Sequence, residues 1–359
     1  MSVVRVLAFY LPQYHPIPEN DGWYGKGFTE WTNVGKAKPL FRGHYQPQVP
    51  ADLGYYDLRV PETRQAQADL ACEYGVEGFC YWHYWFGKGR RLLERPFNEV
   101  LSSGKPDFPF CLAWANHSWH GIYCGLKTKE PVMTQTYNGI GDYEQHFYDV
   151  LPAFKDKRYV TVDSKPFFLI YAPQEIPNPQ EFIACWQDLA IQNGLKGIHF
   201  VAHTYRPDYI DSLLSLGFDA VNVVRLFEYQ RTGLSFFRMA LNKINREIFK
   251  HGFWCDYKDA MKYFTGIEDQ REDVYPTLVP NWDHSPRTGK YGAILKGATP
   301  ALFQKHVETV VTSVSRKQEE HRIVILKSWN EWAEGNYMEP DLKHGRGYLE
   351  ALLNGIQSV

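Results

Sequence analysis

Short apolar runs rich in β-branched and aromatic residues alternate along the chain with longer segments of helical character. Alternating strands and helices are the pattern of a parallel sheet built from βα units. Eight units of this kind close into a barrel, so we predict an α/β protein with a (β/α)8 TIM-barrel fold. The eight predicted strands are Val3–Tyr10, Val76–Tyr81, Pro109–Trp114, Pro166–Tyr171, Gly197–His203, Phe218–Arg225, Val274–Pro280 and Arg322–Lys327.

Three segments between these runs have clear helical boundaries. Pro61–Gly75 has proline in its first turn and ends at glycine, the asymmetry expected of a helix. Asn178–Asn193 is followed by a glycine, and Pro300–Glu320 is long and mixed in charge. These segments are predicted to be helices of the barrel.

Two further segments, residues 11–55 and 228–273, are too long to be ordinary βα loops. Loops of such length without structure are uncommon unless they are functional. We predict that they are insertions capping one end of the barrel, the second with a helix near Ser235–Lys250. The chain has no internal repeat, low-complexity tract or linker-like change in composition, so residues 1–359 are predicted to form a single catalytic domain.

Charge and hydropathy narrow the possible partners. With 39 Lys and Arg against 41 Asp and Glu, no overall field would draw the protein to nucleic acid or to an anionic membrane. No apolar stretch approaches the roughly 18 to 20 residues needed to span a bilayer, so no transmembrane segment is expected. The N-terminus shows no signal-peptide pattern, and we expect a cytoplasmic protein.

Aromatic residues make up 16% of the chain, and many lie beside polar residues just after predicted strands. Catalytic groups of such barrels come from this end of the strands. Sugar rings have apolar faces and a rim of hydroxyls, so aromatic platforms with amide, imidazole and charged neighbours predict a site for an oligo- or polysaccharide. The predicted substrate-binding residues are Tyr10, Gln13, His15, Trp31, Tyr81, His83, Trp114, Asn116, His117, His203, Tyr205, Arg225, Asn281, Trp282, Trp329, Asn330 and Trp332.

The last predicted strand leads into an aromatic loop with two glutamates, Glu331 and Glu334. Cleavage of a glycosidic bond usually needs two carboxyl groups, one protonated and one ionised. In a helical turn their Cβ atoms would lie roughly 5 to 6 Å apart, and two close carboxylates raise the pKa of one of them. We predict that both glutamates are catalytic; the alternative is an ordinary solvated turn.

An aromatic, glycine-rich segment, Gly22–Val34, precedes the first predicted helix of the barrel. It contains Glu30, which could face the same pocket or pair with a nearby lysine. Neither a dinucleotide fingerprint nor a G-x-x-x-x-G-K-[ST] phosphate loop is present, so no cofactor is expected. There is no H-E-x-x-H motif and no C-x-x-C pair among the six cysteines, so no metal site is predicted.

Four of these stretches resemble the WbsX-like family, which is related to glycoside hydrolase family 99: Phe9–Pro16, Gly27–Val34, Trp114–Asn116 and Trp329–Gly335. The resemblance covers nearly the whole chain. WbsX-like proteins are often labelled glycosyltransferases of O-antigen or other surface polysaccharide synthesis. Family 99 enzymes are retaining endo-acting α-mannosidases and α-mannanases on a (β/α)8 barrel.

The resemblance also implies roles for the two glutamates. Glu331 would deprotonate the sugar 2-hydroxyl, which attacks the anomeric carbon to give a 1,2-anhydro sugar. Glu334 would protonate the leaving oxygen and then activate water. A retaining glycoside hydrolase or transglycosidase on α-linked mannose-like residues is the main hypothesis. A glycosyltransferase is the second, weakened by the absence of a D-x-D motif, although Arg225, Arg206 and Lys327 could hold phosphates. A non-catalytic glycan-binding barrel is the third.

Overall fold

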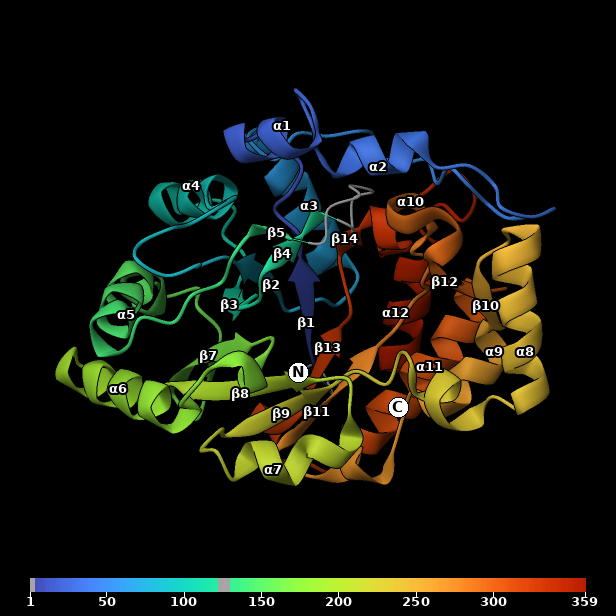
Figure 1. The fold of residues 1–359 in the computed structure, drawn as a ribbon. Helices are drawn as coiled ribbons and strands as arrows, with labels where there is room; N and C mark the ends of the chain where they lie inside the picture. Colours follow the sequence, from blue (N-terminus) through green and yellow to red (C-terminus); the bar gives the residue numbers. More distant parts are fainter. Residues whose placement is uncertain (1–3, 122–129) are drawn as a thin grey trace.

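Eight parallel strands form a closed barrel at the centre of the molecule (Figure 1). The computed structural model describes residues 4–121 and 130–359. Hydrogen bonds join β13 to β1 and β3 to β7, so the sheet has no open edge between these eight strands. The predicted (β/α)8 barrel is confirmed, and each predicted run overlaps one strand. The strands are β1 (Arg5–Tyr10), β2 (Gly78–His83), β3 (Phe110–Trp114), β7 (Lys165–Ile170), β8 (His199–Thr204), β9 (Ala220–Val223), β11 (Val274–Leu278) and β13 (Ile323–Leu326).

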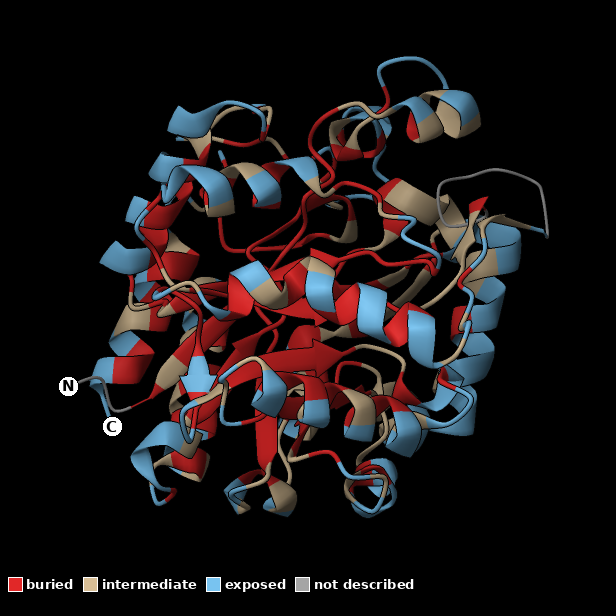
Figure 2. Ribbon diagram, turned by 90° about the vertical axis from the view of Figure 1, so that its left-hand side faces the viewer, coloured by how far each residue is buried: buried red, intermediate tan, exposed pale blue. Residues whose placement is uncertain are grey.

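These strands are buried along almost their whole length, and Figure 2 shows them as the buried centre of the protein. In a parallel barrel one face of each strand packs on the interior and the other on the helices. This two-sided burial explains why the strands are continuous apolar runs in the sequence rather than alternating ones.

Helices surround the barrel and present their exposed side to solvent (Figure 2). Asn178 caps α6, as its side chain accepts a hydrogen bond from the Glu181 amide. The helix predicted for Pro300–Glu320 ends at Val314. In the turn that follows, the buried Lys317 donates to the Val274 carbonyl of β11. The surrounding helices are α3 (Pro61–Glu73), α4 (Arg95–Ser103), α5 (Ile140–Phe154), α6 (Pro179–Gln192), α7 (Ile210–Leu214), α11 (Pro300–Val314) and α12 (Gly347–Gln357).

The segment 11–55 carries two short helices, α1 (Pro18–Tyr24) and α2 (Glu30–Lys36), which lie over the carboxyl ends of the strands (Figure 1). The segment 228–273 lies beside the barrel. It contains α8 (Phe236–Ile244), a π-helical turn η5 (Asn245–Phe249), β10 (Phe253–Asp256) and α9 (Tyr257–Ala260).

Strand β10 pairs in parallel with β12 (Ala293–Lys296), which follows the seventh strand of the barrel. Around this pair lies a second, smaller apolar cluster that includes Cys255, Tyr257 and Trp282. Among the helices of the described residues, none has the length and apolar character needed to cross a membrane.

Candidate active site

A cleft of about 620 Å³ lies at the carboxyl ends of the barrel strands. Leu11, Ala115 and Lys327 line it directly after β1, β3 and β13. Tyr24 of α1 and Arg287 of α10 (Ser285–Thr288) line it from the loops above. Its volume is in the range of pockets that take small molecules.

Glu331 and Glu334 line this cleft from a tight hairpin that follows β13. Strand β14 (Asn330–Glu331) pairs antiparallel with β15 (Asn336–Tyr337), and one 3-10 turn, Trp332–Glu334, joins them. The turn therefore begins one residue after Glu331. Glu331 is the last residue of β14 and Glu334 is the last residue of the turn, so one short hairpin fixes the positions of both carboxylates.

Hydrogen bonds hold the start of the hairpin to the end of β1. The Asn330 side chain accepts from the Leu11 amide over 2.7 Å and donates to the Leu11 carbonyl over 3.0 Å. The Ser328 hydroxyl accepts from the amides of Asn330 and Glu331, at 3.1 and 2.9 Å. The backbone that carries Glu331 is thus fixed before any ligand arrives.

The other end of the hairpin closes at Gly335, which has a φ of 54°. Only glycine adopts this left-handed conformation without strain. A Cβ at this position would lie 2.7 Å from the Asp283 Cβ and 2.9 Å from the Asp283 amide nitrogen. This close approach lets the Asp283 amide donate to the Glu334 carbonyl over 2.7 Å. Gly335 therefore ties the catalytic hairpin to the loop that follows β11.

Beneath the hairpin lies a buried carboxylate, Glu339. It accepts hydrogen bonds from Trp332 Nε1 at 2.6 Å, from the Tyr56 hydroxyl at 2.9 Å and from Gln67 Nε2 at 2.6 Å. Burial raises the pKa of Glu339 to about 7, although these donors lower it. The Trp332 ring also stacks on Tyr337 at 3.8 Å. These contacts with Glu339 and Tyr337 fix the Trp332 side chain, and with it the turn, inside the protein.

Arg287 binds three carboxylates at once through three different nitrogens. Nη1 lies 2.5 Å from Glu334 Oε1, Nη2 lies 2.8 Å from Glu331 Oε2, and Nε lies 2.8 Å from Glu30 Oε1. Burial opposes the charge of Arg287, but these carboxylates outweigh it and raise its pKa well above the ordinary value. Arg287 is therefore a permanent cation between Glu331 and Glu334. Glu30 pairs with this arginine, whereas the sequence left a lysine partner open.

The two glutamates differ in their electrostatic surroundings. Burial, followed by repulsion from Glu334, raises the pKa of Glu331 to about 8. Burial also acts on Glu334, but Arg287, Lys327 and His284 together hold its pKa below the ordinary value. His284 Nε2 lies 3.7 Å from Glu334 Oε1. In the ligand-free protein near pH 7 the pair therefore carries one proton, on Glu331.

Aromatic side chains form much of the remaining wall of the cleft. Trp82 and Tyr171 meet edge to face with ring centroids 5.5 Å apart, and Trp119 meets Tyr84 in the same way at 4.9 Å. Such rings offer flat apolar surfaces beside the polar carboxylate group. The cleft thus combines apolar platforms with an acid and a base on one side.

Six residues predicted from the sequence line this cleft: Gln13, His117, Tyr205, Trp282, Glu331 and Glu334. Their side chains come from five different strand ends. The closure of the barrel brings them together, as expected for residues at the carboxyl ends of its strands.

The other predicted residues lie outside the lining of the cleft: Tyr10, His15, Trp31, Tyr81, His83, Trp114, Asn116, His203, Arg225, Asn281, Trp329, Asn330 and Trp332. Several of the aromatic residues among them belong to the core. The Tyr10 hydroxyl donates to Gln67 at 2.6 Å, and Trp114 Nε1 donates to the Trp85 carbonyl at 3.0 Å. The polar atoms of Tyr10 and Trp114 therefore have partners within the protein.

Three polar members of this group, Arg225, His203 and Asn116, have internal partners. Arg225 is buried and makes an ion pair of 2.6 Å with Asp269. His203 Nδ1 lies 2.8 Å from Asn222 Oδ1. The Asn116 side chain bonds the backbone that follows β7, as the Ala172 amide donates to its Oδ1 at 2.7 Å. His203 thus connects β8 to β9, and Asn116 connects the segments that follow β3 and β7.

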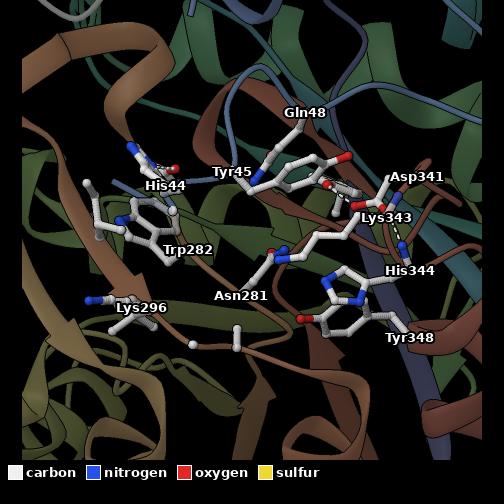
Figure 3. Close-up of a pocket in the computed structure, with 18 of the residues that line it drawn as sticks. His44, Tyr45, Gln48, Asn281, Trp282, Lys296, Asp341, Lys343, His344 and Tyr348 are labelled. Atoms are coloured by element: carbon white, nitrogen blue, oxygen red, sulfur yellow. Dashed lines mark hydrogen bonds and ion pairs between the residues drawn. The ribbon is translucent and has the colours of Figure 1, made fainter. Parts of the chain in front are cut away.

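Asn281 faces a second, smaller cavity of about 100 Å³ (Figure 3). Tyr45, Lys343 and Tyr348 line this cavity with it, and Trp282 lines both cavities. The indole of Trp282 therefore separates the small cavity from the cleft that holds the two glutamates.

Arg287 and His284 line the cleft, although the sequence analysis did not select them as site residues. Lys327, which was considered there only as a phosphate ligand, lines the cleft as well. His284 belongs to the polar run that follows the seventh predicted strand, so its position was a usable signal. Arg287 carried no such signal, because it belongs to no recognisable motif. In the described part of the chain, no group of three or more His, Cys, Asp or Glu side chains could hold a metal ion.

Solved structures of glycoside hydrolases share this fold. An endo-α-mannosidase of glycoside hydrolase family 99 from Bacteroides thetaiotaomicron matches with a TM-score of 0.62 and 14% identity, covering 99% of this chain and 96% of that one. A structure described as a glycoside hydrolase-like protein matches with a TM-score of 0.60 and 15% identity, covering 98% of this chain and 94% of the other. At these identities the similarity establishes the fold.

Two curated proteins are more similar to this chain in sequence than these solved structures are. An uncharacterized protein named WxcX from Xanthomonas campestris pv. campestris is 36% identical over 349 residues, and its counterpart from strain B100 is 35% identical over 350. Each alignment covers 96% of this chain and 48% of the relative, so the chain spans about half the length of these curated relatives. The model of the family described as Glycosyltransferase WbsX matches residues 6–352, and the chain belongs to this family.

Proposed function

We propose that this protein is a retaining glycoside hydrolase or transglycosidase that acts on α-linked, mannose-like residues of a polysaccharide. The observation that carries the proposal is the pair Glu331 and Glu334, both bound to the Arg287 guanidinium in a buried, aromatic-lined cleft. The different electrostatic surroundings of two neighbouring carboxylates supply an acid and a base from one hairpin.

In the first step, Glu331 takes the proton of the substrate 2-hydroxyl, and that oxygen attacks the anomeric carbon. The bond to the leaving oxygen breaks, and Glu334 gives its proton to that oxygen. The product is a 1,2-anhydro sugar. In the second step, Glu334 takes a proton from water or from an acceptor hydroxyl, the resulting oxygen attacks the anomeric carbon, and Glu331 returns its proton to O2. Each displacement inverts the anomeric centre, so the configuration is retained overall.

This route restricts the substrate. The 2-hydroxyl can displace a leaving group at C1 only from the opposite face of the ring, so the two oxygens must be trans. An α-linked mannose-like residue has this arrangement, whereas an α-linked glucose-like residue does not. The aromatic walls support a saccharide chain, because rings such as Trp82 and Tyr171 can stack on the apolar faces of sugars.

The first step requires the proton on Glu334, whereas burial places it on Glu331 in the ligand-free site. The pair of glutamates carries one proton in both states, and the states differ only in which glutamate holds it. A bound 2-hydroxyl that donates to Glu331 stabilises the ionised form of that residue, and a glycosidic oxygen beside Glu334 stabilises its protonated form. Substrate binding therefore favours the transfer of the proton that the chemistry requires.

A glycosyltransferase is the second candidate, favoured by the description of the family and by Lys327. Lys327 lines the cleft with its ammonium 5.5 Å from the Trp282 ring, where a sugar phosphate could reach it. The other two cations considered for this role have acidic partners: Arg225 pairs with Asp269, and the exposed Arg206 pairs with Asp208. Of these three cations, Lys327 alone lines the cleft, and a single lysine is a weak binding site for a sugar diphosphate.

Incubation of the protein with bacterial surface polysaccharide, followed by mass analysis of the products, tests the proposal. Fragments that form without any nucleotide sugar support hydrolysis, and strict dependence on a nucleotide sugar supports the second candidate. Glu331→Gln and Glu334→Gln should each abolish turnover. Glu350→Gln, at an exposed position of α12, is the control and should retain it. Normal turnover by both active-site variants would rule out this chemistry.

A further inference from the structure

Helix α8 and the turn η5 expose a continuous apolar stripe. Phe237, Leu241, Ile244 and Ile248 are spaced by four, three and four residues, which places them on one side of a helix. Their exposed fractions are 72%, 38%, 43% and 68%. Phe236 and Phe249 extend the stripe at its two ends, with exposed fractions of 84% and 58%. A surface helix normally turns such a stripe toward the core.

The side of α8 that faces the protein is polar instead. Asn242 is buried, and its Oδ1 accepts from the Trp254 amide of β10 over 3.4 Å. Arg238 pairs with Asp256 over 3.2 Å and lies 4.8 Å from the Trp254 ring. Polar contacts thus attach the helix to the protein, and its apolar side faces solvent.

Positive charge surrounds the stripe. Lys243, Arg246 and Lys250 alternate with the apolar residues of α8 and η5, where Glu247 is the one acidic residue. The loop 36–43, which starts at the last residue of α2, adds Lys36, Lys38 and Arg42 without any acidic residue. The ring centroids of its Phe41 and of His251, which follows η5, lie 6.1 Å apart. Figure 1 shows this loop extending from α2 toward α8. The overall charge of −2 gives no attraction to anions, so any attraction is local to this face.

We propose that this apolar and basic face, formed by α8, η5 and the loop 36–43, binds the surface of an anionic lipid bilayer. Interfacial helices combine large apolar side chains, which enter the boundary between head groups and acyl chains, with basic residues that contact anionic head groups. A second copy of the chain fits this face less well. Symmetric pairing would bring two sets of like charges together around the apolar contact.

The face lies next to the rim of the catalytic cleft. Glu247 of η5 pairs with Lys290 over 3.4 Å, and the adjacent Tyr291 lines the cleft. Binding through this face would therefore hold the cleft close to the membrane surface. This orientation suits a saccharide that is presented at a membrane.

Vesicle co-sedimentation of the full chain, without any saccharide, tests the proposal independently of catalysis. The protein should bind vesicles that contain phosphatidylglycerol and should bind phosphatidylcholine vesicles much more weakly. Ile248→Ser should weaken binding about tenfold, because it removes an apolar side chain from the lipid. Ile191→Ser is the matched control, since Ile191 is 64% exposed on α6, on the opposite side of the barrel (Figure 1). It should bind like the unaltered protein.

A double variant, Lys243→Glu with Lys250→Glu, tests the electrostatic part and should abolish the preference for phosphatidylglycerol. Equal binding by the Ile248→Ser variant and the unaltered protein would overturn the proposal, as would absence of binding to both kinds of vesicle. A dimer that Ile248→Ser disrupts, without vesicle binding, would assign the face to a second copy instead. Sedimentation velocity measures that outcome.

Discussion

Arg287 Nη1 lies 2.5 Å from Glu334 Oε1, although the two residues are 47 positions apart and follow different strands of the barrel. The same guanidinium also binds Glu331 and Glu30. Arg287 therefore orients both proposed catalytic carboxylates and compensates part of their repulsion. The position of the acid and base depends on this arginine as much as on the hairpin that carries them.

Replacement of Arg287 by methionine should lower kcat/KM by about a hundredfold or more, the scale for loss of one preorganised electrostatic contact in an active site. The substitution leaves the carboxylates of Glu331 and Glu334 without their shared cation. Arg206→Met is the matched control, because Arg206 is exposed and pairs with Asp208. Equal activity of both variants would show that Arg287 has no part in catalysis.

The acid and base roles can be separated by the quality of the leaving group. A variant that lacks the general acid should recover turnover on an aryl glycoside, whose leaving group departs without a proton. A variant that lacks the base should not, because the 2-hydroxyl must still be activated. We expect recovery for Glu334→Gln and none for Glu331→Gln, measured as kcat/KM on aryl and alkyl α-mannosides. The reverse pattern would exchange the two roles.

Activity should require one proton on the pair of glutamates. Because the pKa of Glu331 is raised to about 8, kcat/KM should fall as the pH rises through about 8 and the pair loses this proton. The charge of Lys327 lowers the pKa of both glutamates. Lys327→Met should therefore move this alkaline limb to higher pH. A limb that stays in place or moves to lower pH would contradict the assignment of the proton to this pair.

Gly335→Ala should reduce both stability and activity, because the new methyl group would lie 2.7 Å from the Asp283 Cβ. Gly345 is a matched control: its φ is 53°, close to the 54° of Gly335, but its added Cβ would have no neighbour within 4 Å. Gly345→Ala should cost about 1 kcal/mol from the backbone conformation alone. Urea denaturation should show a larger loss for Gly335→Ala, and equal losses would mean that the contact with Asp283 is not tight.

The eight strands and the starts of helices α3, α6 and α11 could be predicted from the amino-acid sequence alone. Strand signals survive in a single sequence because parallel barrel strands are buried on both faces and must be apolar throughout. Glu331 and Glu334 were also visible, since two carboxylates close to two tryptophans are unusual in a core. Both signals are local: each depends on residues that are neighbours in the chain.

Tertiary contacts, in contrast, set which strand-end side chains reach the cleft and which are held inside the protein. Trp332 and Asn330 are adjacent to the glutamates in sequence, yet Glu339 and Leu11 engage them inside the protein. Conversely, Arg287 and Glu30 are 257 positions apart and meet through an ion pair of 2.8 Å. Such contacts exist because closure of the barrel places loops from distant parts of the chain around one axis, and this distance in sequence leaves no pattern that a single sequence can show.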